Sequence, residues 1–315
     1  MKYKIAKLSF NGNVHFGEGT LEKSGFSLSS DTIFSALCCE LAKTGREEEI
    51  EQLIFNISDG KLKISDAFPF KDELLFLPRP FINVKADNDD GNSVEKKAFK
   101  KLKYISIDKY DMFLKGNFKY EECKKALDDI NDISKFAIYE QVAIKEGADS
   151  EPYSVGKVRF KNKCGLWFII AAHDDGIMNE LTELIYSLSL SGIGGKRSSG
   201  CGRFVTEFDE LPEYLLSNLE RESEKAVSLS VCLPRNEEIE NALEDASYGV
   251  LKRSGFVYSE NYASSSQKKN DLYVFVAGSC FKNRFKGDVY DVSAGGSHKV
   301  YRYAVPMFLS IGGES

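Results

Sequence analysis

Hydrophobic patterns divide the first two-thirds of the chain into distinct elements. The segment YKIAKLSF at 3–10 alternates apolar and polar residues, which predicts a strand. Apolar residues at helical spacing predict a helix that begins near Ser29, Ser30 or Asp31 and ends near Gly45. The remaining predicted elements are a strand at 62–68, a strand pair over 158–173, a helix over 177–190 and a strand at 203–208.

This order of strands and helices is typical of a ferredoxin-like, RNA-recognition-type domain. A second set of elements follows a polar helix after residue 209. It is predicted as a strand at 227–234, a helix at 237–246, an extended segment at 248–259 and strands at 271–281 and 298–311. We therefore predict two domains, at 1–209 and 210–315.

Residues 83–110 interrupt the first domain with a polar, lysine-rich segment that carries little core signal. We expect an exposed excursion from the domain body. Its lysines are candidates for gripping phosphates, and the alternative is a solvated run of charge. The lysines are Lys96, Lys97, Lys100, Lys101 and Lys103.

Composition fits a soluble globular protein, with 42% hydrophobic and 29% charged residues among 315. The net charge of −6 argues against nonspecific nucleic-acid binding, although basic stretches stand at 96–103, 192–203 and 282–286. Seven cysteines without a CxxC pair suggest reduced thiols, and no His/Cys cluster has metal spacing. We expect a cytoplasmic protein with no metal, no cofactor and no membrane span.

The segment GIGGKRSSGCGR at 192–203 is the strongest candidate for binding chemistry. Glycines let the backbone take positive φ and let another molecule come close, and turn backbone N–H groups can form an anion site. Lys and Arg side chains beside them suit phosphate. The candidate residues are Gly192, Gly194, Gly195, Lys196, Arg197, Ser198, Ser199, Gly200, Gly202 and Arg203.

Two known nucleotide loops do not fit this segment. A Walker A loop requires a glycine where Leu190 stands, and a Rossmann loop requires one where Arg197 stands. The segment also joins a helix to a strand, which is the reverse of a Rossmann loop. An ordinary glycine-rich loop with solvated charges remains the alternative.

The segment GIGGKRSSGCGRF resembles the glycine-rich loop of the RAMP superfamily of CRISPR proteins. Further segments resemble the fourth Csm subunit of type III-A CRISPR effector complexes, in the same order from about residue 3 to 311. They are HFGEGTLEKSGFSLSSDTIFSAL, DAFPF, LLFLPRP, YGVLKRSGFVYS, VAGSCF and HKVYRY.

The resemblance implies an α+β fold of two ferredoxin-like, RRM-like RAMP domains, with a thumb-like hairpin at about 83–110. It implies a non-catalytic, RNA-binding subunit that holds the repeat-derived 5′ tag of the CRISPR RNA. The implied protein partners are the large polymerase-type subunit and a backbone RAMP subunit.

Single-stranded RNA also needs flat surfaces on which bases stack. His15, Phe16, Phe99, Tyr104, Phe256 and Tyr301 are candidates, with core packing as the alternative for each aromatic residue. Arg253 and Arg302 stand near Phe256 and Tyr301 and are expected to contact RNA. The expected RNA-binding set is completed by Gly17, Ser30 and Gly255.

Three other functions compete with this hypothesis. An endoribonuclease that processes CRISPR repeat RNA would need a general base, for which His15 is the candidate. A metal phosphohydrolase is suggested only by the dipeptide His173-Asp174, which lacks further ligands. A protein adaptor without RNA contact would fit the acidic net charge.

Overall fold

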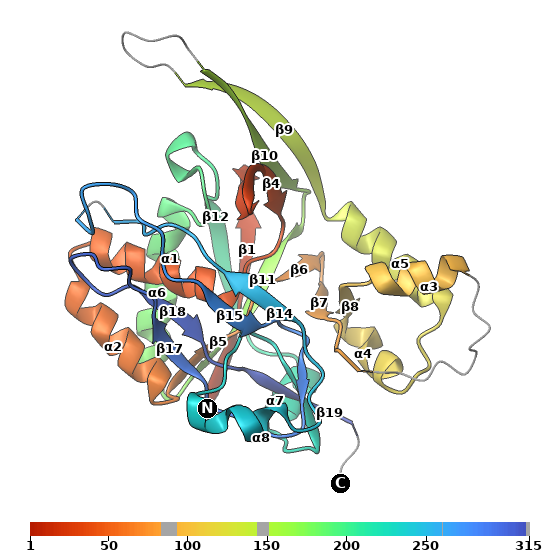
Figure 1. Cartoon of the computed structure of the whole chain (residues 1–315). Coiled ribbons are helices and arrows are strands. Elements are labelled where there is room, and N and C mark those ends of the chain that lie inside the picture. The colour runs from red at the N-terminus through yellow and green to blue at the C-terminus, as the bar shows by residue number, and fades with distance from the viewer. Residues whose placement is uncertain (83–92, 144–150, 260, 313–315) are drawn as a thin grey trace.

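The computed structural model describes residues 1–82, 93–143, 151–259 and 261–312. Its centre is a seven-stranded sheet in the order β12-β1-β11-β6-β7-β8, with β5 pairing β11 and every strand pair antiparallel (Figure 1). Its strands are β1 (Lys2–Phe10), β5 (Leu62–Ile64), β6 (Phe68–Lys71), β7 (Leu74–Pro78), β8 (Tyr104–Ser106), β11 (Cys164–Ala172) and β12 (Phe204–Asp209).

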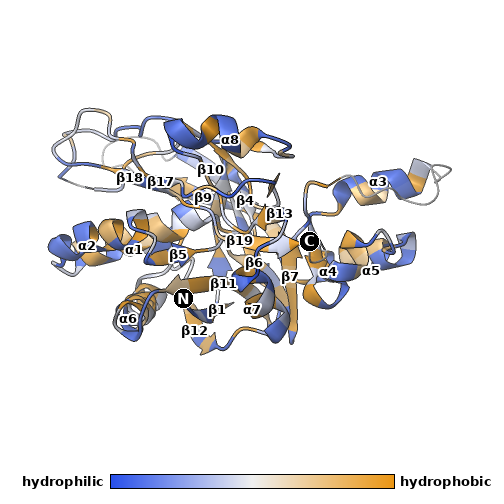
Figure 2. Ribbon diagram, turned by 90° about the horizontal axis from the view of Figure 1, so that it is seen from below, coloured by the Kyte–Doolittle hydropathy of each residue, from blue (hydrophilic) through white to orange (hydrophobic). Residues whose placement is uncertain are grey.

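Strand β11 is buried at every position because both faces of the sheet are covered. Its residues alternate between two cores, with Phe168 and Ile170 in one and Trp167 and Ile169 in the other. The first core lies under α1 (Ser30–Lys43) and α6 (Asp175–Ser191), beside α2 (Glu47–Ser58). In Figure 2 hydrophobic residues follow the central strands and hydrophilic residues lie on outer parts of the helices.

The predicted helical stripes are confirmed in α1 and α6. Ile33, Phe34 and Leu37 of α1 are buried, as are Leu181 and Leu188 of α6. Helix α6 begins at Asp175, two residues before the predicted range, and the Asp174 side chain caps it by accepting a hydrogen bond from the backbone N–H of Ile177 at 3.0 Å.

A lobe of three helices stands beside the sheet edge at β8, on the right of Figure 1. It contains α3 (Ser93–Lys101), α4 (Ile107–Leu114) and α5 (Tyr120–Asp132). The described part of 83–110 is therefore a helix, a strand and the start of another helix, and the prediction of an exposed hairpin here was wrong. Leu102, Ile105 and Tyr110 are buried and pack against the second core. Residues 83–92 lie outside the described part.

The long hairpin of the chain lies elsewhere, and is formed by β9 (Ser134–Ala143) and β10 (Glu151–Phe160). It rises from the top of the molecule in Figure 1. The base of β10 pairs with β2 (Asn13–Val14), while β4 (Thr20–Gly25), which pairs with β3 (Phe16–Glu18), also contacts β10.

The C-terminal part is built from short strands. They form one three-stranded sheet, β16-β13-β19, and two-stranded pairs β14-β15 and β17-β18. Its elements are α7 (Glu213–Glu220), β13 (Lys225–Ser228), α8 (Ile239–Leu243), β14 (Val250–Arg253), β15 (Leu272–Phe275), β16 (Cys280–Phe281), β17 (Asp288–Asp291), β18 (Tyr301–Ala304) and β19 (Phe308–Ile311). The predicted strands at 271–281 and 298–311 are each split in two, and Gly278, with φ +94°, and Pro306 lie at the breaks.

Both cores continue across residue 209. Tyr303 and Val305 belong to the core under α1, and Leu215, Val227 and Leu309 belong to the core on the other face of the sheet. The division into two domains at residue 209 stays a prediction.

A buried carboxylate joins the C-terminal strands to α1. Asp31 accepts from Arg253 Nε and Nη2, each at 2.8 Å, and from Arg302 Nη1. The Asp31 side chain is fully buried. Burial alone would raise the pKa of this carboxyl group, but the two guanidinium groups hold it below its usual range. Arg253 and Arg302, which we expected to contact RNA, are therefore engaged inside the fold.

We expect Asp31→Asn to lower the free energy of unfolding by about 3–5 kcal/mol at pH 7, because it leaves buried guanidinium groups without a counter-charge. A lowered pKa contributes stability that is present above the unfolded value of 3.8 and is lost as the pH falls through the folded value. The difference between wild type and variant should therefore shrink at pH 3. Urea unfolding at both pH values measures it. The exposed Asp128→Asn is the control, and a loss below about 1 kcal/mol at pH 7 would contradict the assignment.

Candidate nucleic-acid interface

The glycine-rich loop, residues 192–203, joins α6 to β12 and is held in place by backbone hydrogen bonds. Gly195 N–H donates to His15 O at 2.8 Å, and Gly202 N–H donates to Asn13 O at 2.9 Å. Ile193 N–H donates to Gly202 O at 2.9 Å, which closes the loop on itself. The buried Ile193 side chain anchors it to the core. The loop is thus fixed to residues 13–15 at both of its ends.

Most glycines of this loop serve close packing within the chain. A Cβ at Gly202, where φ is +82°, would lie 2.1 Å from Ile193 O. A Cβ at Gly194, where φ is +93°, would lie 2.7 Å from the ring of Phe16. A Cβ at Gly195 would lie 2.7 Å from His15 Cδ2, whereas one at Gly200 meets open space. The need for glycine at 194, 195 and 202 is therefore explained without RNA.

His15 and Phe16 lie beneath the loop, each with 6% of its surface exposed. His15 Nδ1 is 2.7 Å from the carbonyl oxygen of Gly156 in β10, so this nitrogen carries the proton and donates. Phe16 packs edge-on against Phe10 at 5.8 Å between ring centroids. Their predicted role as stacking surfaces does not fit this burial, because the glycines of the loop let it close over both rings.

Two cations of the loop lie over aromatic rings from other parts of the chain. Lys196 Nζ is 4.7 Å from the ring centroid of Tyr153 in β10, and Arg197 Cζ is 4.6 Å from that of Tyr258. Tyr258, from the C-terminal part, is 75% exposed. Neither Lys196 nor Arg197 forms an ion pair with any described residue.

We call these residues, together with their exposed neighbours, the loop surface. It comprises Tyr153, Lys196, Arg197, Ser198, Ser199, Gly200, Arg203 and Tyr258. Sequence reasoning identified the loop members and missed both tyrosines. Nothing in the local pattern around Tyr153 or Tyr258 distinguishes them from the other tyrosines.

The remaining predicted RNA contacts are dispersed. Gly17 is exposed in β3 and Gly255 faces open space, while Tyr301 is half-buried against the first core. Ser30 is fully buried at the start of α1. The exposed lysines of α3 lie in the lobe, across the molecule from the loop between α6 and β12 (Figure 1). They are Lys96, Lys97, Lys100 and Lys101.

Other chemistry is poorly supported in the part of the chain that the structure describes. No group of three or more His, Cys, Asp or Glu side chains there is placed to hold a metal ion. All seven cysteines are free thiols. No helix among the described residues has the length and apolarity needed to cross a membrane.

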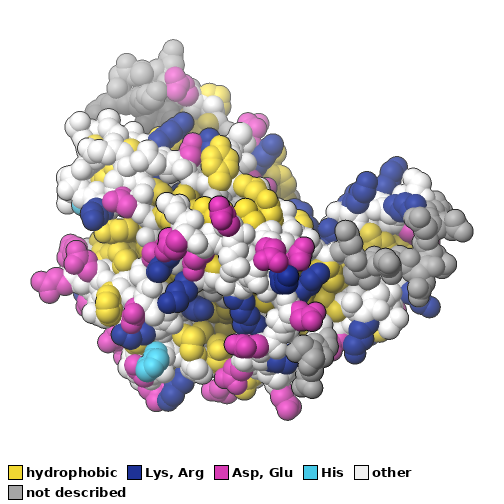
Figure 3. Space-filling view, turned by 60° about the horizontal axis from the view of Figure 1, so that its bottom comes forward, with side chains coloured by type: hydrophobic (Ala, Val, Ile, Leu, Met, Phe, Trp, Pro, Cys, Tyr) yellow, Lys and Arg dark blue, Asp and Glu magenta, His cyan; other side chains and the backbone are white. Residues whose placement is uncertain are grey.

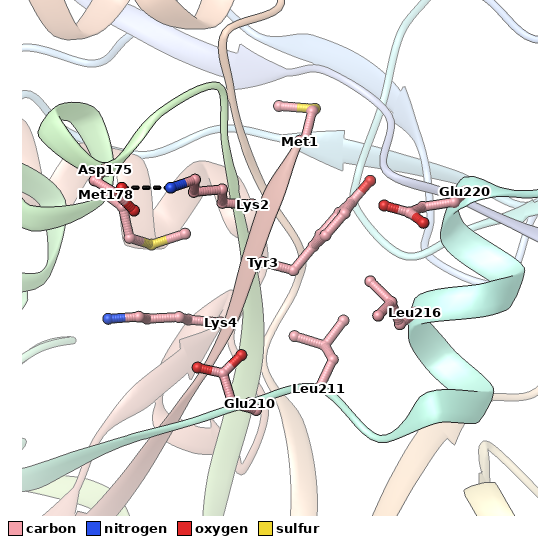
Figure 4. Close-up of a pocket in the computed structure, with 10 residues that line it drawn as sticks. All are labelled: Met1, Lys2, Tyr3, Lys4, Asp175, Met178, Glu210, Leu211, Leu216 and Glu220. Carbon is pink, nitrogen blue, oxygen red and sulfur yellow. Dashed lines mark hydrogen bonds and ion pairs between the residues drawn. The ribbon is translucent and has the colours of Figure 1, made fainter.

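A shallow cavity of about 360 Å³ at the start of β1 offers no catalytic arrangement (Figure 4). Lys2 forms an ion pair with Asp175 there, and Tyr3 points toward Glu220. Burial and the nearby Glu220 carboxylate raise the pKa of Tyr3, so its hydroxyl group stays protonated at neutral pH.

We expect Gly195→Ala to destabilise the protein by about 1–3 kcal/mol, because its methyl group would displace the buried His15 ring. Removing that ring should relieve the clash, so the effect of Gly195→Ala should be much smaller in a His15→Ala background. Thermal or urea unfolding of the two single variants and the double variant measures this coupling. Equal effects of Gly195→Ala in both backgrounds would show that the methyl group meets something else.

Family models cover most of the chain. One described as the RAMP superfamily matches residues 7–205, and one described as the CRISPR Csm4 C-terminal domain matches residues 221–311. The chain is 34% identical to a CRISPR system Cms protein Csm4 of Mycobacterium tuberculosis (strain CDC 1551 / Oshkosh), covering 99% of this chain and 98% of the relative. It is also 34% identical to a protein of that name from Streptococcus thermophilus, covering 99% of both chains.

Solved structures share the fold at lower identity. A chain of the Csm3-Csm4 subcomplex in the type III-A CRISPR-Cas interference complex matches with a TM-score of 0.68 and 20% identity, covering 99% of this chain and 100% of the other. A chain of a Csm1-Csm4 cassette in complex with pppApA matches with a TM-score of 0.61 and 18% identity, covering 99% and 98%. The earlier resemblance to the fourth Csm subunit is confirmed: the chain belongs to the Csm4 family within the RAMP superfamily of CRISPR proteins.

Proposed function

We propose that this protein is a non-catalytic, RNA-binding subunit of a type III-A CRISPR-Cas interference complex in antiviral defence. It holds the repeat-derived 5′ tag of the CRISPR RNA on the loop surface. The observation that carries the proposal is the pairing of Lys196 and Arg197, which have no acidic partner among the described residues, with Tyr153 and Tyr258 on a fixed loop. Cations beside aromatic rings suit the phosphates and bases of a single strand.

We also propose that the protein links the large polymerase-type subunit to a backbone RAMP subunit. The similar structures described as a Csm3-Csm4 subcomplex and a Csm1-Csm4 cassette support this, because those relatives assemble with one partner of each kind. The sheet order β12-β1-β11-β6, with α1 and α6 on one face, supports a ferredoxin-like interpretation of the first domain. The short, separate strand pairs after residue 209 give the second domain weaker support.

The endoribonuclease alternative depends on His15, whose surroundings disfavour it. The imidazole is 6% exposed, its Nδ1 donates to Gly156 O, and its far edge faces Gly17 and Gly195. A general base must come within hydrogen-bond reach of the 2′-hydroxyl group that it deprotonates. Here the glycine-rich loop covers that approach.

We expect Lys196→Ala combined with Arg197→Ala to weaken binding of the tag by the assembled complex without unfolding the protein. Each lost phosphate contact should flatten the log–log salt dependence by about 0.7, or about 1.4 for two contacts. Binding titrations measure the slope, over a salt range of about 50 to 300 mM that includes the physiological ionic strength. Lys225→Ala with Lys286→Ala removes the same charge from exposed sites and is the control. An unchanged slope in the folded double variant would contradict the placement of RNA on this loop.

We expect the purified protein to leave CRISPR repeat RNA intact in the presence of EDTA, because His15, the candidate general base, is buried beneath the glycine-rich loop. Gel analysis of end-labelled RNA is the measurement. Cleavage that disappears in a His15→Gln variant would favour the nuclease over the holding role.

A further inference from the structure

A second cavity of about 410 Å³ lies where the lobe meets the C-terminal part. Its lining includes the apolar residues Phe81, Leu251 and Val276 and the acidic residue Asp66. Lys100 and Lys103 stand at its lobe side, and both are exposed. In Figure 3 a notch separates the lobe, which carries several lysine side chains, from the main body. The cavity is thus lined by apolar residues, by lysines from the lobe and by one acidic residue.

The Asp66 carboxylate is fixed rather than mobile. Its Oδ1 atom accepts hydrogen bonds from Ser30 N–H at 2.7 Å and Val231 N–H at 2.9 Å, which come from the N-terminal and C-terminal parts of the chain. Asp66 is only 8% exposed, and that remaining surface lines the cavity. The Ser30 side chain also lies beside this carboxyl group and lowers its pKa. No hydrogen bond from a described residue ends on Oδ2, so this oxygen is the remaining acceptor of a carboxylate that lines the cavity.

The charge of this acceptor follows from its surroundings. Burial raises the pKa of Asp66 to about 6, although the two backbone donors oppose the shift. Above that pH the carboxyl group is ionised and only accepts hydrogen bonds. The other charged groups lining the cavity are Arg79, Lys100 and Lys103, and Arg79 donates to Phe99 O at 2.7 Å.

A single segment of the chain runs from the lining of the cavity to the loop surface. Leu251, in β14, lines the cavity, and residues 254–258 lead from the end of β14 to Tyr258, whose ring faces Arg197. Along this segment Phe256 is exposed, with Lys268 Nζ 5.8 Å from its ring centroid. This segment therefore carries two exposed rings, Phe256 and Tyr258, with cations beside them, and such rings suit the bases of a single-stranded RNA.

We propose that this cavity takes one base of the bound RNA, and that Asp66 Oδ2 accepts a hydrogen bond from an exocyclic amino group of that base. This inference rests on the proposed function, because it presumes that an RNA strand crosses the loop surface. Lys100 and Lys103 then neutralise the flanking phosphates, which gives these lobe lysines a role at a site separate from the loop.

The chemistry predicts which bases enter. Adenine, cytosine and guanine each carry an exocyclic amino group, and an acidic side chain accepts well from such a donor. Uracil offers only a ring N–H between two carbonyl oxygens, which an ionised carboxylate repels. A base without an amino group would leave the buried Asp66 acceptor without a hydrogen bond, and this lowers the affinity for that base. The pocket therefore selects for an amino-bearing base and against uracil.

The test uses the complex reconstituted from this chain and its neighbouring subunits, loaded with CRISPR RNAs randomised over the 5′ tag. Sequencing of the retained RNA should show one position at which amino-bearing bases exceed uracil by about tenfold or more, as expected for one specific pair. Asp66→Asn keeps the acceptor for Ser30 and Val231 but presents an amide N–H₂ to the base. It should abolish that preference and shift it toward the carbonyl groups of uracil.

Asp128→Asn is the matched control, because it removes one carboxylate from an exposed site of α5 that does not line the cavity. A Lys100→Gln, Lys103→Gln variant should weaken retention without changing the preferred base. Normal RNA retention with the same base preference in wild type and Asp66→Asn overturns the base-reading role alone. Loss of retention for every sequence in the wild-type complex overturns the proposed function and this inference with it.

Discussion

The two halves of the molecule depend on the buried carboxylate of Asp31. It neutralises Arg253 at the end of β14 and Arg302 in β18, and so holds both strands against the start of α1. Neighbouring Ser30 donates to Asp66, which also binds the backbone of Val231. One helix N-terminus thus fixes three segments of the C-terminal part. Tyr258, five residues beyond Arg253, is placed beside the glycine-rich loop as a consequence.

This arrangement explains why the candidate site is composite. The loop supplies Lys196 and Arg197, the hairpin supplies Tyr153, and the C-terminal part supplies Tyr258. A fragment that ended at residue 209 would lack one of the two rings. It would also lack Arg253 and Arg302, the two counter-ions of Asp31. The ranges of both family matches therefore contribute residues to the candidate interface, although they cover separate parts of the chain.

The sequence predicted β1, β5, β11 and β12 of the first sheet and helices α1 and α6 because their signals are local, and it missed β6, β7, β8 and α2. The alternation of 3–10 and the stripe from Ile33 to Leu41 need no knowledge of distant residues. The lobe was missed because its lysines dominate the composition, while Leu102, Ile105 and Tyr110 become core residues only when the sheet edge lies beside them. The C-terminal strands were predicted too long because their hydrophobic segments are continuous in the sequence. In the structure these segments are interrupted near Gly278 and Pro306.

The RNA contacts assigned to the loop stay a prediction, and other assignments did not fit the structure where burial depends on distant partners. Arg302 and Asp31 are separated by 271 positions, so nothing near either residue reveals that they meet. His15 stands among glycine and asparagine residues, which suggested exposure, yet the loop at 192–203 covers it. Tyr153 and Tyr258 could not be identified as site candidates for the same reason. Each is singled out only by its contact with a cation that is distant in the sequence, Lys196 or Arg197.

An acidic protein can hold RNA locally if its cations are unequally neutralised. Several exposed or half-exposed cations pair with carboxylates, among them Lys252 with Asp271 and Lys282 with Glu244. Lys196 and Arg197 form no ion pair with a described residue, and under the proposed function their charge would neutralise a phosphate. Backbone hydrogen bonds already fix the loop in the free protein. RNA binding there would therefore immobilise few further residues, and less of the interaction free energy would be lost as conformational entropy. The net charge of −6 then keeps nonspecific polyanions away from the rest of the surface.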